Sequence, residues 1–221
     1  MGFLTLEEIK KCEEVITFLE IADKQLEGLG YTEHSYRHVG LVACAAGEIL
    51  KTLGFEERKV ELARIAGYLH DIGNAVNRID HAHSGAILAY NILTKMGMNY
   101  REAGEIMLAI GNHDENTGTA VSVISAALIL ADKSDVHRTR VRNKDIPTFD
   151  IHDRVNYAVE NSKIYVDKCK MHAILELQID TDICPVMDYF EIFLGRMTMN
   201  RRAAEFLKLK FKLLINGIHL L

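Results

Sequence analysis

The chain has 221 residues, of which 48% are hydrophobic and 26% are charged, a composition typical of a soluble globular protein with one main domain. The formal net charge of −5 excludes a general attraction to duplex nucleic acid or to an anionic membrane surface. The most apolar run, residues 121–131, is too short to cross a bilayer. The four cysteines form no CxxC pair, which predicts reduced thiols. The first residues, MGFLTLEEIKKCEE, turn acidic too early for a signal peptide, and together these features predict a cytoplasmic protein.

The first 135 residues are predicted to be helical almost throughout, because apolar residues recur three and four positions apart. Turns that contain glycine or asparagine separate the segments, and only two prolines, Pro147 and Pro185, interrupt the chain. The expected helices run over residues 5–27, 35–53, 56–71, 80–96, 99–113 and 120–135.

The pattern changes after about residue 140. Residues 138–147 are polar and basic and are predicted to form a loop, whereas residues 162–167 and 173–180 alternate apolar and polar positions as strands do. A helix fits residues 184–207, and residues 211–221 are expected to hold a last strand or two. We therefore expect a mainly α protein, with a helical bundle over residues 1–145 and a small α/β subdomain, an antiparallel sheet plus a helix, over residues 146–221.

Histidine and aspartate residues on the expected helices are the candidate functional residues. His70 and Asp71 close the third helix, where both side chains can reach one ion, although histidine at a helix end also suits the helix dipole. His38, His113 and Asp132 each continue an apolar stripe. A buried aspartate without a partner is unfavourable, so such a residue needs a cation or strong hydrogen-bond donors.

His81 shares its helix face with Gly85, whose missing side chain lets another helix approach closely, and His83 on the same helix is an alternative. A single histidine on an apolar helix is more often a satisfied core residue than a ligand. Four imidazoles and two carboxylates on five successive helices instead favour a metal site. Mixed nitrogen and oxygen ligands suit Mn, Fe, Co, Ni or Zn.

The order of His38, His70-Asp71 and Asp132 resembles the metal motif of the HD superfamily of phosphohydrolases. The segments HVGLVACAAGEILKTLGF (38–55), ARIAGYLHDIGN (63–74) and LADKSD (130–135) look like that family's second helix, third helix and closing aspartate segment. HAHSGAILA (81–89) and AIGNHDE (109–115) resemble the branch with two extra histidines, which binds two metals. The resemblance covers about residues 30–140 and implies an HD-type bundle over residues 1–145.

The resemblance also implies two divalent transition-metal ions, from among Fe, Mn, Co, Ni and Zn. The implied ligands of the first ion are His38, His70, Asp71 and Asp132, and Asp71 would bridge to a second ion held by His81 and His113.

Two histidines compete with the implied ligands. The family's histidine stands four residues before a glycine, here Gly85, which favours His81 over His83. The residues that follow fit the family register from His38, so His34 is interpreted as a surface or pocket-rim residue.

The sequence departs from the family pattern at two places. Thr119-Ala120-Val121 stands where relatives of the cyclic-dinucleotide phosphodiesterase branch have Gly-Tyr-Pro, which argues against that branch. Asn74 stands where many relatives have a lysine that can touch a phosphate.

A basic segment, DKSDVHRTRVRN (132–143), directly follows the last implied ligand. Arginine and lysine match phosphate oxygens in charge, so Lys133 and Arg138 join Asp71 as candidate catalytic residues. A solvated loop whose cations pair with nearby aspartates explains the segment equally well.

The resemblance implies a metal-dependent phosphohydrolase, either a phosphomonoesterase or a phosphodiesterase, that cleaves a nucleotide or dinucleotide phosphoester by metal-activated hydroxide. The sequence has neither GxSxG nor GxxxxGK to indicate another route. A non-catalytic metal-bound nucleotide sensor or interaction module is the alternative, and a purely structural helical domain would bury six ionisable residues without purpose. The expected partners are a small phosphorylated substrate and a second copy of the chain, with no membrane contact.

Overall fold

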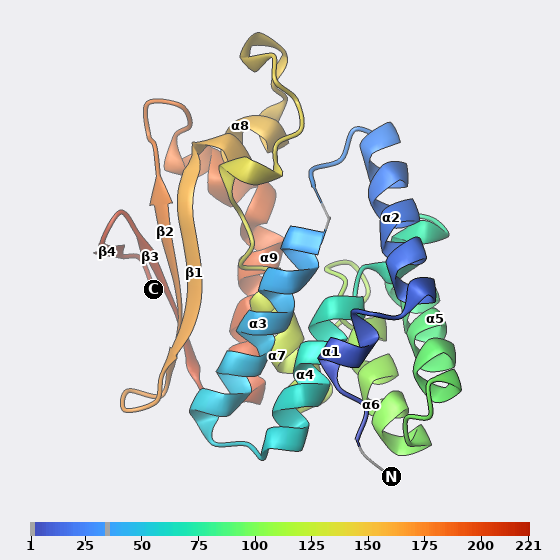
Figure 1. The fold of residues 1–221 in the computed structure, drawn as a ribbon. Coiled ribbons are helices and arrows are strands. Elements are labelled where there is room, and N and C mark those ends of the chain that lie inside the picture. Colours follow the sequence, from blue (N-terminus) through green and yellow to red (C-terminus); the bar gives the residue numbers. More distant parts are fainter. Residues whose placement is uncertain (1–2, 34–35) are drawn as a thin grey trace.

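A computed structural model of the protein describes residues 3–33 and 36–221. Helices make up its first two thirds (Figure 1). They are α1 (Leu6–Ile9), α2 (Glu13–Gly28), α3 (Tyr36–Leu53), α4 (Glu57–Leu69), α5 (His81–Lys95), α6 (Tyr100–Gly111) and α7 (Val123–Asp132). A short 3₁₀ turn, η1 (Ile72–Ala75), connects α4 to the loop before α5.

The helix expected over residues 5–27 is divided into α1 and α2. Thr5 and Glu8 form a capping box at the start of α1, and the helix ends at Lys10 after a single turn. Because Leu6 and Ile9 are buried just as Val15 and Leu19 are, the apolar period continues across the break. Periodicity alone therefore predicted one helix where there are two.

The C-terminal part combines a helix-rich connection with a sheet. Two 3₁₀ turns, η2 (Arg138–Arg140) and η3 (Ile146–Thr148), precede α8 (Ile151–Ala158). Then follow β1 (Val159–Asp167), β2 (His172–Ile179), α9 (Val186–Phe206), β3 (Lys210–Ile215) and β4 (Ile218–His219). The strands lie in the order β1-β2-β3-β4.

The expectation of an antiparallel sheet is wrong for one of its pairings. β1 pairs antiparallel with β2, and β3 with β4, but β2 and β3 are parallel. The helix α9 lies between β2 and β3 in the chain and carries it back to the starting edge, so that the two strands run in the same direction. The sheet is therefore mixed.

Helix α9 is sandwiched between the sheet and the bundle (Figure 1). It contacts α7 on one side and β2 and β3 on the other, while β1 packs on α3. Tyr189, Phe193 and Met197 bury this helix in an apolar core that continues from the bundle helices to the sheet. The apolar residues of this helix predict that it buries one side on the strands and another on the bundle or a second subunit, and its contacts confirm the strands and the bundle. The unit boundary near residue 145 and the homodimer stay predictions.

Glycines allow two close approaches between backbones in the bundle. A Cβ atom on Gly67 of α4 would lie 2.7 Å from the Cα atom of Ala43 in α3. A Cβ atom on Gly73 would lie 2.0 Å from the carbonyl oxygen of His81 and 2.4 Å from the backbone nitrogen of Gly85. The missing side chains thus bring α3 to α4 and η1 to α5.

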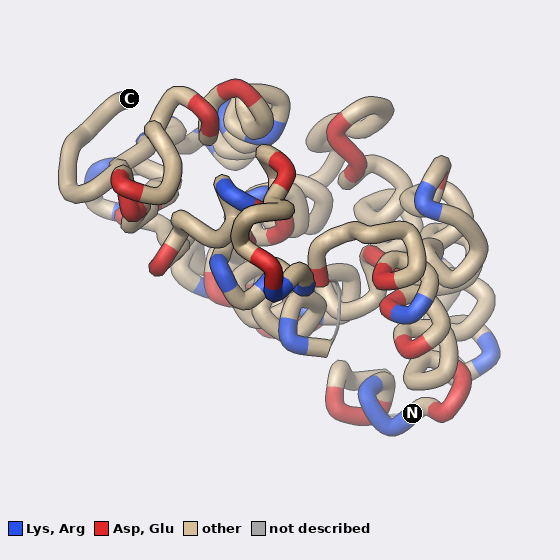
Figure 2. Tube along the Cα trace, turned by 90° about the horizontal axis from the view of Figure 1, so that it is seen from above, with Lys and Arg blue, Asp and Glu red and all other residues tan. Residues whose placement is uncertain are grey.

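Charged residues of both signs mix over the molecule. Lys and Arg positions lie among Asp and Glu positions along the trace in Figure 2, which agrees with the small net charge. Over residues 3–33 and 36–221, none of the helices has both the length and the apolar character that a membrane span requires.

Candidate metal centre

Six histidine and aspartate side chains meet where helix ends come together. His38 lies in the first turn of α3, and His70 and Asp71 follow the last residue of α4. The others are His81 at the first residue of α5, His113 just after α6 and Asp132 at the last residue of α7. All six are buried. The structure thus brings together every residue that the sequence nominated as a metal ligand.

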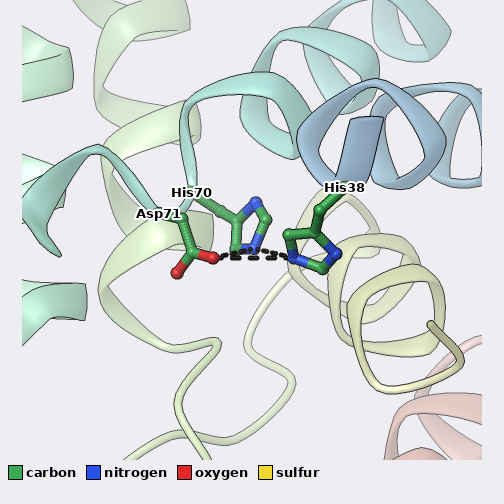
Figure 3. A group of neighbouring side chains, drawn as sticks. All are labelled: His38, His70 and Asp71. Atoms are coloured by element: carbon green, nitrogen blue, oxygen red, sulfur yellow. Dashed lines mark hydrogen bonds and ion pairs between the residues drawn. The ribbon is translucent and has the colours of Figure 1, made fainter. Parts of the chain in front are cut away.

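Four of these residues surround one point. The Nε2 atoms of His38 and His70 are 3.2 Å apart. Asp71 Oδ2 lies 3.5 Å from the first of these nitrogens and 3.3 Å from the second. Figure 3 shows these three side chains directed at one another from α3 and the end of α4. Asp132 Oδ1 completes the group at 3.4 Å from His38 Nε2 and 3.5 Å from His70 Nε2.

A second group adjoins the first and shares Asp71 with it. Asp71 Oδ1 lies 3.5 Å from His81 Nε2, and His81 Nε2 lies 3.2 Å from His113 Nε2. The two oxygens of one carboxylate therefore face two different sets of imidazoles. Within each of three overlapping triads, the potential ligand atoms lie within 4.8 Å of one another; the triads are His38-His70-Asp71, His70-His113-Asp132 and Asp71-His81-His113.

Hydrogen bonds on the far side of each ring fix how the imidazoles point. The Nδ1 atoms of His70, His81 and His113 lie 2.8, 3.1 and 2.6 Å from backbone carbonyl oxygens. The Nδ1 atom of His38 lies 2.7 Å from a carboxylate oxygen of Asp135. Because these oxygens only accept, each Nδ1 carries the hydrogen and each Nε2 is left to face the centre.

The spacing of the donors fits metal ions. Two ligand atoms about 2.1 Å from one ion, at angles between about 90° and 110°, lie about 3.0–3.4 Å apart. The distances in both groups, 3.2–3.5 Å, lie inside this range or within about 0.1 Å of it. His81 and His113 also present two nitrogen lone pairs to each other at 3.2 Å, which is unfavourable unless a cation lies between them.

The charges around the rings agree with a site built for cations. Burial lowers the pKa of His113 to about 3, and the positive charge of His70 acts in the same direction. Burial opposes the charged form of His70 as well, but the carboxylates of Asp71 and Asp132 outweigh it and raise the pKa to about 10. A proton on His70 thus takes the place that a metal cation would hold between the two carboxylates.

The two cations proposed from the basic segment lie in different surroundings. Lys133 is buried, with Nζ 2.7 Å from Asp132 Oδ2 and 3.7 Å from Glu115 Oε1, so it borders the cluster. Arg138 donates from Nη2 to Glu160 Oε1 at 3.0 Å, and its guanidinium lies 5.4 Å from the ring centroid of Tyr157. Within the described parts of the chain, these contacts place Arg138 with α8 and β1 and not with the cluster, and its contact with phosphate stays a prediction.

The structure describes one of the two competing histidines, His83. His83 is exposed and lies 3.6 Å from the carboxylate of Asp80, whereas His81 is buried in the second group. His34 lies outside the described residues.

The structure adds two residues that the sequence analysis did not nominate as part of the site. Asp135 lies just after α7, three residues beyond Asp132, and accepts the hydrogen bond from His38 described above. Asn74 is buried and donates from Nδ2 to Asp71 Oδ1 at 2.9 Å, and so it holds the shared carboxylate. Both residues stand three positions after an implied ligand, and this spacing is the only signal in the sequence.

A cavity of about 400 Å³ opens beside the cluster. Its wall includes Arg78, whose Nη1 lies 3.4 Å from His81 Nε2. Other lining residues come from the turn after α6 and from α8 and α9; they include Asp114, His152, Phe193 and Arg196. The cavity has the volume of a small-ligand site.

Comparison with known proteins identifies the family. The HD domain profile matches residues 34–150. An uncharacterized protein of Methanocaldococcus jannaschii is 30% identical over 184 residues, which cover 72% of this chain and 70% of that protein. Ribonuclease Y of Acetivibrio thermocellus is 31% identical over 139 residues, 63% of this chain but only 25% of the ribonuclease. The crystal structure of a predicted HD superfamily hydrolase from an uncultured Thermotogales bacterium shares 27% identity, with a TM-score of 0.45 over 61% of this chain and 75% of that one. The chain belongs to the HD domain family.

Proposed function

We propose that this protein is a metal-dependent phosphohydrolase that cleaves a phosphoester of a small molecule, with nucleotides and dinucleotides as the favoured substrate class. The observation that carries the proposal is the shared carboxylate: Asp71 presents one oxygen to His38 and His70 and the other to His81. Two divalent ions bound there would lower the pKa of a water molecule and neutralise charge on the phosphoryl oxygens.

The surrounding side chains prepare the site for this reaction. Asn74 holds Asp71, and Asp135 orients His38, so neither ligand has to reorganise during the reaction. Lys133 adds a buried ammonium group at the edge of the first group of ligands. A positive charge in that position favours a phosphoryl group as negative charge develops on its oxygens.

The relatives support hydrolysis of phosphoesters. Ribonuclease Y, which is similar over 139 residues, is named for cleavage of RNA, and the HD domain match at residues 34–150 includes the region that holds the cluster. The chain spans about a quarter of that enzyme's length, so the reaction class is what we carry over, and the RNA substrate is not. A cytoplasmic location is part of the same proposal.

A turnover screen tests the function. The purified protein, loaded with Mn, Fe, Co or Ni, is offered nucleotides, dinucleotides and simple phosphate esters, and released phosphate or nucleotide is measured. We expect turnover with at least one of these substrates. The variant His70→Ala should abolish this activity, and the matched control His83→Ala, which changes an exposed histidine outside the cluster, should keep it.

Two outcomes would contradict the proposal. Turnover that survives His70→Ala would belong to another site or to a contaminant. Tight nucleotide binding without turnover under any metal would instead identify a metal-bound sensor, the alternative function that an intact cluster beside a cavity also permits.

A further inference from the structure

Three arginines line the cavity beside the cluster: Arg78, Arg140 and Arg196. Arg140 is buried and donates to two backbone carbonyl oxygens, from Nη1 to Asp135 at 2.6 Å and from Nε to Glu33 at 3.1 Å. Its guanidinium is therefore part of the framework. Arg78 and Arg196 remain as the two cations at the cavity wall, and they come from distant parts of the chain.

Arg78 stands between the cavity and the second group of ligands. Its Nη1 donates to Asn74 Oδ1 at 3.3 Å and lies 3.4 Å from His81 Nε2. The guanidinium carbon of Arg78 also lies 5.7 Å from the centroid of the Tyr31 ring. His81 Nε2 would hold a metal ion, so Arg78 borders the atom that links the cavity to the second group of ligands.

Arg196 is held in place from two directions. Its Nε donates to Glu115 Oε1 at 2.7 Å, and its guanidinium carbon lies 4.4 Å from the ring centroid of Phe193. Within the described parts of the chain, Nε is the nitrogen of Arg196 that forms an ion pair. The two Nη atoms are left as a preoriented donor pair at the cavity wall, a geometry that matches phosphate oxygens.

Four carboxylates line the cavity wall, and each has a partner in the chain. Asp153 accepts a hydrogen bond from Nδ2 of Asn143 at 3.3 Å. Asp114 accepts a hydrogen bond from the backbone nitrogen of Asn116 at 3.1 Å, and Asp150 caps α8 through the backbone nitrogen of Asp153 at 2.8 Å. Glu115 faces the ammonium group of Lys133 as well as Arg196. Lys133 and Arg196 thus offset the negative charge of Glu115, the carboxylate that contacts the proposed pair.

We propose that Arg78 and Arg196 form a phosphate-binding pair, which selects small molecules with a terminal phosphate group as ligands of this cavity. The cavity volume of about 400 Å³ suits a ligand of nucleotide size. Phe193 and Arg196 lie on α9, beyond residue 150 where the family match ends, so this wall lies outside the matched domain. Phosphate binding by this pair does not depend on the proposed function. Only hydrolysis of the bound phosphate group rests on it.

Calorimetric titration tests the pair without any turnover. The full chain, loaded with Mn²⁺, is titrated separately with inorganic phosphate, adenosine 5′-monophosphate and adenosine. We expect phosphate and the monophosphate to bind and adenosine to bind at least tenfold more weakly than the monophosphate. Arg78→Ala and Arg196→Ala should each weaken both phosphorylated ligands about tenfold to a hundredfold, because each removes a charge-assisted contact.

Matched variants separate recognition from charge and from folding. Arg78→Lys and Arg196→Lys should recover only part of the affinity, since an ammonium group cannot make the forked contact. Arg101→Ala and Arg201→Ala remove exposed arginines of α6 and α9 outside the cavity wall and should leave binding unchanged. The metal content and melting temperature of each variant show whether its site and fold are intact.

Several results would overturn the pair. The pair is rejected if both alanine variants bind phosphate as tightly as the wild type does, or if the wild type binds no phosphate. It is also rejected if adenosine binds as tightly as adenosine 5′-monophosphate. Failure of the pair and failure of the proposed function are distinguishable. Turnover with unchanged phosphate binding in the variants rejects the pair alone, whereas phosphate binding that depends on both arginines, without turnover, rejects the function alone.

Discussion

Asp71 is the residue on which both halves of the metal centre depend, because its two oxygens face different imidazoles. We propose that the wild type binds two ions per chain, and we expect Asp71→Asn to bind less than one, since a neutral amide cannot bridge two cations. His113→Ala should lose only the second ion, because the first group does not need this side chain. Elemental analysis of the purified variants measures both. Two ions retained in Asp71→Asn would mean that the carboxylate is not shared.

The raised pKa of His70 predicts how metal-free protein responds to pH. Its pKa moves from 6.5 to about 10, so the stabilisation it contributes is complete below pH 6.5 and is lost as the pH rises to about 10. With a chelator present, the free energy of unfolding of the wild type should therefore fall across this window more steeply than that of His70→Gln. Denaturant unfolding at several pH values measures the difference, and parallel pH profiles would contradict it.

Metal affinity should change in the opposite direction over the same pH range. An ion must displace the proton of His70, so binding at pH 7 releases protons and tightens as the pH rises. Calorimetric titration of Mn²⁺ in buffers with different ionisation enthalpies counts the protons released. No release at pH 7 would mean that His70 is neutral before the metal arrives.

The six clustered residues could be predicted from the sequence because each is a metal-ligand type at a helix end and together they follow a family order. Asn74 and Arg78 could not, since their roles depend on the turn that η1 makes towards α5. Arg138 was nominated because it lies in a basic segment next to the last implied ligand; in the structure it donates to Glu160, and its contact with phosphate stays a prediction.

At the scale of elements, the contact of η1 with α5 sets the position of His81. We expect Gly73→Ala to push these backbones apart, because its Cβ atom would meet backbone atoms of His81 and Gly85 at less than 3 Å. The variant should lose the second ion and melt at a clearly lower temperature. The control Gly104→Ala adds a Cβ atom in open space inside α6 and should be neutral or stabilising by about 0.5–1 kcal/mol. Equal melting temperatures for the two variants would contradict the close contact.

A second element-scale prediction concerns Asn200 on α9. The residue is fully buried, and neither its amide nitrogen nor its amide oxygen has a hydrogen-bond partner among the described residues. Replacement of a buried unsatisfied amide by an apolar side chain of similar volume should stabilise the protein by about 1–3 kcal/mol. Asn200→Leu should therefore raise the melting temperature. A lower one would show that the amide is hydrogen-bonded in solution.

The directions of the strands mark the limit of what alternation in the sequence can predict. Residues 173–179 alternate clearly enough to indicate a strand, but alternation is identical in parallel and antiparallel pairs. The information on direction lies in α9, since a helix that connects two strands of one sheet favours parallel pairing.

At the scale of the whole molecule, the C-terminal part completes both the core and the cavity. Tyr189, Phe193 and Met197 are buried between α7 and the sheet, so a chain that ends at residue 145 would expose the bundle surface they cover. We expect this truncated protein to aggregate and to have lost phosphate binding, as size-exclusion chromatography and calorimetry would show. A soluble, monomeric and fully active truncated protein would contradict this prediction.

During its synthesis, the chain would become able to bind the metal ions and the phosphorylated ligand at different times. The six clustered side chains are all present once Asp132 has left the ribosome, whereas Arg196 follows much later in α9. A nascent chain can therefore bring the ligands of the metal centre together before the far wall of the cavity has been synthesised. Metal capture would then precede substrate binding during synthesis, and the chain would become able to hold a phosphorylated ligand only as its last helix folds into place.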